Sequence, residues 1–227
     1  SWRLSTSRLT YQATTKDKIN VHWDEQHACN GSTFNTTEDG CRQQPDSGNR
    51  IGPLGLGGLS PTTSPELGQY LDAHPRVRQV TWSETRTNRM LFEAGFGAYQ
   101  APFGPYESPG NTTRPFARVT EQCAAGCTAN GGIPNLTYRS QNWSDSWDAQ
   151  YTWRASVSYV TGAHNLKVGY GGVALVSDLQ GFTNDNNLSY TVNNGVPISL
   201  TQSLLPFTTS YRTRNMSFYV QDQWTRG

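Results

Sequence analysis

Apolar and polar residues alternate one by one along several stretches of this chain, each about ten residues long. In the first, Leu9 and Tyr11 alternate with polar neighbours, a polar turn follows at 14–17, and the alternation resumes over 19–23. A period of two residues is typical of a β-strand whose two faces meet different surroundings. The N-terminal part of the chain is therefore predicted to form a β-hairpin.

The same scheme recurs twice before a last predicted strand. Its turns are predicted at 84–88 and 161–165, where polar residues interrupt the alternation. Helical periodicity is hard to find anywhere, so the chain is predicted to be all-β, with about seven strands of barrel length. The strands after the first hairpin are predicted at 80–82, 90–98, 151–159, 166–170 and 216–224.

Long connections separate the hairpins, at about 28–75, 102–149 and 178–210, and all leave the strands at the same end. They are rich in Gly, Pro, Asn, Ser and Thr, and the third contains a short hairpin around an Asn-Asn-Gly turn at 193–195. Compact soluble domains rarely contain unstructured loops beyond about 12–15 residues. Short turns on one side and long extracellular loops on the other are typical of outer-membrane barrels. We therefore expect residues 1–227 to be a segment of a transmembrane antiparallel β-barrel.

In such a barrel, side chains alternate between lipid and lumen. A Lys or Arg facing lipid at mid-depth costs about 2–4 kcal/mol. The apolar rows carry no charge at their centres, whereas the opposite rows carry residues such as Glu93 and Lys167. Four charged residues share the parity of the apolar rows near predicted strand ends: Arg78, Arg212, Arg214 and Asp222. The residues expected to face lipid are Leu9, Tyr11, Ile19, Val21, Trp23, Phe92, Phe96, Trp153, Val157, Tyr159, Val168, Tyr170 and Phe218.

The composition argues against several other classes of protein. Hydrophobic residues make up 34% of the chain, charged residues 15% and aromatic residues 11%. Disordered chains combine few aromatics with high net charge, so this chain is expected to fold. A net charge of +1 without a run of Lys or Arg gives no support for nucleic-acid binding. The chain has no apolar stretch of membrane-helix length, no initial Met and no signal peptide, and is expected to be an internal fragment or a processed product.

Four cysteines fall in two close pairs, Cys29 with Cys41 and Cys123 with Cys127. Their polar, Gly-rich surroundings fit disulfide-closed loops in an oxidising compartment, although the sequence alone permits three pairings. A metal site would need more ligands than His27 adds. The histidines lie far apart without a nucleophile motif. We therefore expect no catalytic site, no metal and no cofactor, and expect that the chain is not an enzyme.

Ligand recognition, if it occurs here, is expected in the long loops and the adjacent lumen rows. Aromatic rings in such loops can stack on sugars, heterocycles or aromatic chelates. The candidates are Tyr106, Phe116, Tyr138, Trp143 and Trp147. For each of them, packing of the loops against one another is the simpler alternative.

The alternation leaves two other architectures open. A soluble, lectin-like β-sandwich with one sheet face on a protein core predicts the same alternation. Such sandwiches have turns about every 8–12 residues at both ends, however, and lack one-sided long loops. A passive porin or adhesin barrel would share the transmembrane architecture without energy coupling.

Several segments resemble the β-barrel of TonB-dependent outer-membrane receptors, in particular the Oar-like group, whose members carry a carboxypeptidase-regulatory-like domain ahead of the plug. The likeness rests on the order and spacing of the segments and covers most of the chain except the region around 30–70. The last segment is similar to the Tyr-x-Gln-Asp-x-Trp run that commonly closes a strand before a periplasmic turn in this family. The segments are RLTYQAT (8–14) with KDKINV (16–21), VTEQC (119–123), IPNLTYR (133–139), TGAHNLKVGY (161–170) and YVQDQW (219–224).

The resemblance implies a barrel of about 22 strands, plugged by an N-terminal domain. It also implies uptake of a scarce ligand (a siderophore, cobalamin, an oligosaccharide or a peptide) with energy delivered through the TonB complex. This chain departs from that pattern, because it holds about seven barrel strands and neither a plug nor a TonB-contacting segment. It is expected to act in the bacterial outer membrane, in contact with lipid and with the rest of the receptor barrel and its plug.

Overall fold

The computed structural model describes residues 2–31, 69–107, 111–124 and 126–225. Within them the chain consists almost entirely of β-strands, apart from a short 3₁₀ helix at Thr128–Asn130. Among the same residues, no helix has the length and apolar character needed to cross a membrane.

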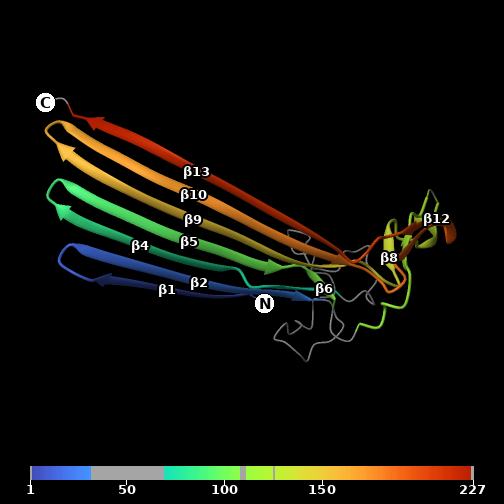
Figure 1. Ribbon diagram of the computed structural model, residues 1–227. Helices are drawn as coiled ribbons and strands as arrows, with labels where there is room; N and C mark the ends of the chain where they lie inside the picture. The colour runs from blue at the N-terminus through green and yellow to red at the C-terminus, as the bar shows by residue number, and fades with distance from the viewer. Residues whose placement is uncertain (1, 32–68, 108–110, 125, 226–227) are drawn as a thin grey trace.

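One large antiparallel sheet dominates the described structure (Figure 1). Its seven long strands pair in chain order, and β3 (Gln69–Ala73) and β6 (Pro105–Glu107) extend it at the loop end of β2. The first and last long strands form the two edges and do not pair with each other within the described residues. The long strands are β1 (Trp2–Gln12), β2 (Asp17–Gly31), β4 (Arg76–Thr87), β5 (Met90–Phe103), β9 (Trp143–Thr161), β10 (His164–Phe182) and β13 (Phe207–Trp224).

All three tight turns between long strands lie at one end of this sheet, and the long connections leave from the other end (Figure 1). The β9–β10 turn consists of Gly162 and Ala163, and Gly162 has a φ of 56°. A positive φ at the first of two turn residues suits the right-handed twist of the flanking strands and favours Gly. The predicted hairpins and the predicted asymmetry between turns and loops are thus confirmed.

The register of the strands gives the sheet two unlike faces. One row of paired residues crosses it from Leu9 to Met216, and almost every member is apolar. All residues predicted to face lipid lie on the same side as this row, which we call the apolar face; the opposite side is the polar face. In order, the row contains Leu9, Val21, Val80, Phe96, Trp153, Gly172 and Met216.

The apolar face is not covered by a second layer of the described chain. Phe96 is 47% exposed, Val157 37% and Phe218 81%. No described side chain of β1, β2 or β13 is buried. A soluble sandwich would bury one face of its sheet against another layer. The arrangement of the described residues therefore contradicts the alternative of a soluble β-sandwich.

A second, smaller sheet lies beyond the loop end of the long strands (Figure 1). Its strands are β7 (Arg118–Glu121), β8 (Leu136–Tyr138), β11 (Leu188–Asn193) and β12 (Val196–Gln202), and we call it the loop sheet. The β11–β12 pair is the predicted short hairpin, with positive φ at Asn194 and Gly195. β7 pairs with β11 in parallel, so two long connections join in one structure.

The long strands continue further into the predicted loops than the alternation indicated. β9 begins at Trp143 and β10 ends at Phe182, and each has 19 residues. Bilayer-spanning strands need only about 9–11 residues. Beyond the alternating segments, backbone pairing between the strands continues although apolar and polar residues no longer alternate strictly. The alternation in the sequence therefore does not mark where the strands end.

Candidate functional site

Aromatic and aliphatic side chains form an open groove on the apolar face. The groove has a volume of about 370 Å³ and crosses β4, β5, β9, β10 and β13. The rings of Tyr170 and Phe218 lie 4.8 Å apart at one end of it. Because almost all of its lining is apolar and it opens outward, this surface is suited to acyl chains rather than to water. The main lining residues are Trp82, Phe92, Val168, Tyr170 and Phe218.

The charged residues on the apolar face lie at its margins. At the turn end, the His164 ring and Asp222 are 2.7 Å apart. At the loop end, the Arg78 guanidinium lies 4.1 Å from the centre of the Trp23 ring, and Arg212 pairs with Asp178 at 2.8 Å. Arg212 and Arg214 differ from the prediction, because β13 begins at Phe207 and both lie within it rather than near its end. Along β13, Met216 is the last apolar residue of this face before Arg214, while the strand itself continues to Phe207.

The polar face carries a network of hydrogen bonds and ion pairs. The Glu93 carboxylate accepts bonds from Lys167 Nζ at 2.7 Å and from the Ser156 hydroxyl at 3.3 Å. Farther along, Asn20 connects Thr10 and Thr81 through bonds of 2.9 Å and 3.3 Å. Charged and hydroxyl groups bonded to one another in this way suit a face turned toward a polar lumen.

A hollow of about 360 Å³ opens on the polar face between β4, β5 and β9. Gly95 and Gly97 lower its floor, because a Cβ atom at Gly97 would lie 2.8 Å from the Thr152 hydroxyl. Gln79, Thr81 and Arg154 supply polar groups around it. The hollow can therefore hold polar atoms of a neighbouring polypeptide segment or of a solute.

Glu121 joins the two long connections whose strands form the loop sheet. Its carboxylate accepts hydrogen bonds from the backbone N–H groups of Cys123 at 2.8 Å, Asn194 at 2.8 Å and Gly195 at 2.9 Å. These bonds, above all those from Cys123 and Gly195, hold the pKa of the Glu121 carboxyl below its ordinary value of 4.5. The Asn193 side chain adds a bond from the Ala124 N–H at 3.0 Å.

Next to Glu121 the loop sheet forms a pocket of about 710 Å³, which we call the loop pocket. Tyr138 and Leu136 line one side of it, and Ile133, 44% exposed, lies at its surface. The Cys123–Cys127 disulfide borders it and constrains the segment that leads into the 3₁₀ helix. An aromatic ring and aliphatic side chains beside backbone polar groups are the usual composition of a small-molecule site.

The predicted loop aromatics do not form one cluster. Trp143 is 1% exposed, with its ring 6.0 Å from Phe182, so a ligand outside the loops cannot reach it. Trp147 lies in β9 and is 38% exposed, and Phe116 is 47% exposed under the Arg139 guanidinium at 5.5 Å. Tyr138 lines the loop pocket. Tyr106 lies in β6, but its side chain lies outside the described part of the structure.

The cysteine expectations are tested in part. Cys123 and Cys127 form a disulfide, one of the predicted pairs. Cys29 lies in β2, but Cys41 falls outside the described residues, as does any bond between them. Across the described ranges, no group of three or more His, Cys, Asp or Glu residues is placed to hold a metal ion.

Sequence reasoning missed Glu121 as a structural residue of the loops. Two of the N–H groups that it binds, those of Asn194 and Gly195, lie more than seventy positions away in the chain. Local pattern carries no signal for such a bond. The Asn194–Gly195 turn was recognisable from the sequence, but Glu121, whose carboxylate binds this turn, was not.

No family model and no curated protein matches the sequence. The structure is similar to the crystal structure of the outer membrane transporter YddB from Escherichia coli, with a TM-score of 0.56 and 11% sequence identity. The alignment covers 99% of this chain and 25% of that chain, so the chain spans about a quarter of the transporter's length. At this identity the likeness shows the fold. The fold is that of a segment of an outer-membrane β-barrel wall.

Proposed function

We propose that this chain forms part of the barrel wall and three extracellular loops of a TonB-dependent outer-membrane receptor, which takes up a scarce ligand with energy from TonB. One observation carries the proposal. The register of seven antiparallel strands brings their apolar rows onto one face, which no described layer covers. Similarity to an outer membrane transporter supports the transport role, and the resemblance of the sequence segments to TonB-dependent receptors supports energy coupling.

The loop pocket is the proposed region of ligand contact. Tyr138 is the sequence-predicted aromatic that lines it, beside Ile133 and Leu136. The ligand class that this lining favours is a small molecule, glycan or peptide with an apolar or ring-shaped part. Phe116 and Trp147 are exposed and remain proposed contacts. Catalysis is not part of the proposal.

A soluble binding module is the first alternative, and expression of residues 1–227 without detergent tests it. The exposed apolar face and the outer edges of β1 and β13, which pair with no other described strand, predict aggregation. A monodisperse monomer that unfolds cooperatively in detergent-free buffer would contradict the barrel assignment.

A passive porin is the second alternative, because it would use the same wall. Planar bilayers containing the full-length protein that carries this segment separate the two functions. A plugged receptor is expected to show no steady conductance and to be crosslinked to the periplasmic domain of TonB. An open channel with no crosslinking to TonB would contradict energy-coupled uptake.

A further inference from the structure

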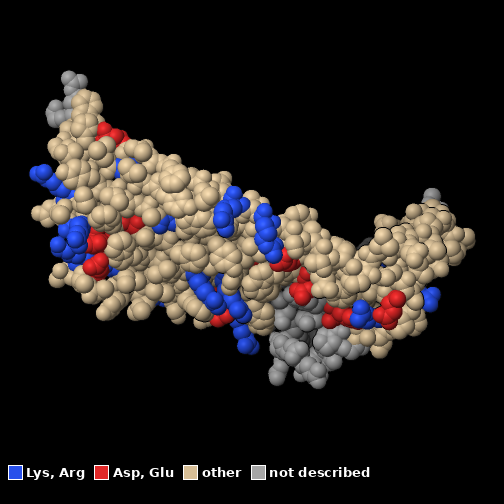
Figure 2. Space-filling view, viewed as in Figure 1, with Lys and Arg blue, Asp and Glu red and all other residues tan. Residues whose placement is uncertain are grey.

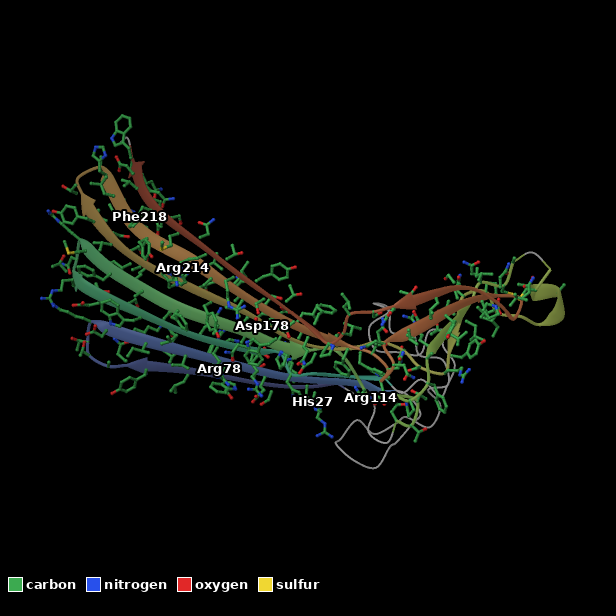
Figure 3. The ribbon with its side chains drawn as sticks, turned by 45° about the vertical axis from the view of Figure 1, so that its right-hand side comes forward. His27, Arg78, Arg114, Asp178, Arg214 and Phe218 are labelled. Carbon is green, nitrogen blue, oxygen red and sulfur yellow. A yellow bond between two sulfur atoms is a disulfide. The ribbon has the colours of Figure 1, made fainter. Side chains whose placement is uncertain are left out.

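Four arginines mark the loop-side limit of the apolar face. Toward the loops, the first charged residue after Val80 on β4 is Arg78, and the first after Met216 on β13 is Arg214. Arg78 and Arg214 belong to the same row of paired residues, and Figure 3 shows both within the long sheet. Figure 2 shows Lys and Arg gathered near the turns and again about midway along the molecule. The four residues, which we call the boundary arginines, are Arg76, Arg78, Arg212 and Arg214.

Two of the boundary arginines are neutralised within the chain. Arg76 Nε lies 3.1 Å from the Glu25 carboxylate. Arg212 pairs with Asp178 at 2.8 Å and also donates to the backbone oxygen of Ser177 at 3.3 Å. Within the described residues, neither Arg78 nor Arg214 forms an ion pair with an acidic side chain. Among the described residues, the two boundary arginines of β4 therefore carry one uncompensated positive charge, and so do the two of β13.

Arg78 contacts an aromatic ring, and its Nε atom has no hydrogen-bond acceptor among the residues that the structure describes. Its guanidinium lies 4.1 Å above the Trp23 ring, a cation–π contact that orients the planar group. Its Nε atom is buried and has no hydrogen-bond partner among the described residues. Arg214 is exposed on β13, next to the apolar row that ends at Met216. Each cation therefore directly follows the apolar residues of its own strand on this face, where acyl chains would give way to headgroups.

We infer that Arg78 and Arg214 bind phosphate groups of anionic lipid headgroups in the leaflet on the loop side of the membrane. The inference rests on the proposed membrane location and goes beyond it by naming the lipid chemistry. Guanidinium groups bind phosphate through paired N–H donors. Apolar side chains directly below each cation would hold the acyl chains of the same lipid. A basic residue near an anionic membrane surface contributes about 1 kcal/mol, or about fivefold in affinity.

The test uses the full-length protein in dodecyl maltoside micelles and a fluorescent, bis-phosphorylated lipid A as the probe. The Arg78→Gln/Arg214→Gln variant is expected to bind the probe about 25-fold more weakly than the unmodified protein. Arg78→Lys/Arg214→Lys keeps both charges and is expected to retain most of the affinity. The matched control, Arg8→Gln/Lys18→Gln, removes two cations from the polar face and is expected to bind like the unmodified protein.

Two further probes identify the chemistry. Dephosphorylated lipid A is expected to bind weakly to all variants, and millimolar inorganic phosphate is expected not to displace the probe. Equal probe binding by the Gln variant and the unmodified protein would overturn the lipid site, as would an equal loss in the polar-face control. Insertion into phosphatidylcholine vesicles is measured separately. A protein that inserts but shows no preference for phosphorylated lipid loses only the lipid site, whereas one that fails to insert contradicts the proposed function.

Discussion

Ala155 offers a direct test of which side of the sheet meets lipid. It lies on the apolar face of β9, midway between Tyr151 and Tyr159, and is exposed. Each Tyr is about 14 Å away along the strand, or about 10 Å in depth at a strand tilt of about 40°. An Arg near mid-depth costs about 2–4 kcal/mol. Ala155→Arg should therefore lower the folding equilibrium constant between about 30-fold and several hundredfold.

The assay is reversible guanidinium unfolding of the full-length protein in phospholipid vesicles, followed by tryptophan fluorescence. Ser156→Arg is the matched control, because its side chain lies on the polar face, next to the Glu93 carboxylate. It should cost less than about 1 kcal/mol. Ala174→Arg, in the row of Tyr151 and Arg214, tests depth and should cost about 0–1 kcal/mol. Equal losses for Ala155→Arg and Ser156→Arg would refute the reasoning.

Three further predictions concern particular contacts. Folding lowers the pKa of Glu121, so its stabilisation of the loop sheet should be complete above about pH 4.5 and should be lost as pH falls through the lower folded-state pKa. Amide protection of residues 123, 194 and 195, corrected for intrinsic exchange, should therefore fall at acidic pH in the unmodified protein but not in Glu121→Gln. Gly172→Ala places a Cβ atom against the Trp153 indole and the Asn215 backbone oxygen and should lower stability by about 1–3 kcal/mol in the unfolding assay. A similar loss for Gly171→Ala, where the nearest atom is 3.3 Å away, would show that this crowding is not the cause. Trp143→Ala removes a buried ring and should cost about 3–5 kcal/mol, seen as faster proteolysis of the loops, while Trp147→Ala, at a site 38% exposed, should have a smaller effect.

The barrel strands could be predicted from the sequence because lipid and lumen impose opposite demands on neighbouring positions. For that reason Val157, on the apolar face, is hydrophobic and its neighbour Ser156, on the polar face, is not. In the sheet, Val157 pairs with Phe92 on one side and with Val168 on the other. Strand ends were less predictable. Trp143 was expected in a loop and lies in β9, because the backbone ladder continues where neither face needs to be apolar.

The loop sheet was only partly predictable. The Asn-Gly turn gave the β11–β12 hairpin, because positive φ at both positions is a local property of these residues. The parallel pairing of β7 with β11 joins residues about seventy positions apart and leaves no periodic trace. For the same reason Tyr138 could be proposed as a contact from its residue type, but the pocket beside Glu121 could not.

Nitroxide scanning of β9 tests the central claim most directly. Single labels at positions 150–159 of the full-length protein in vesicles would be measured for accessibility to oxygen, which concentrates in acyl chains, and to a water-soluble nickel chelate. We predict oxygen maxima at odd positions such as 153, 155 and 157, with nickel maxima at the even positions between them. Low accessibility to both reagents at the odd positions would show that this face packs against protein, and would contradict the account.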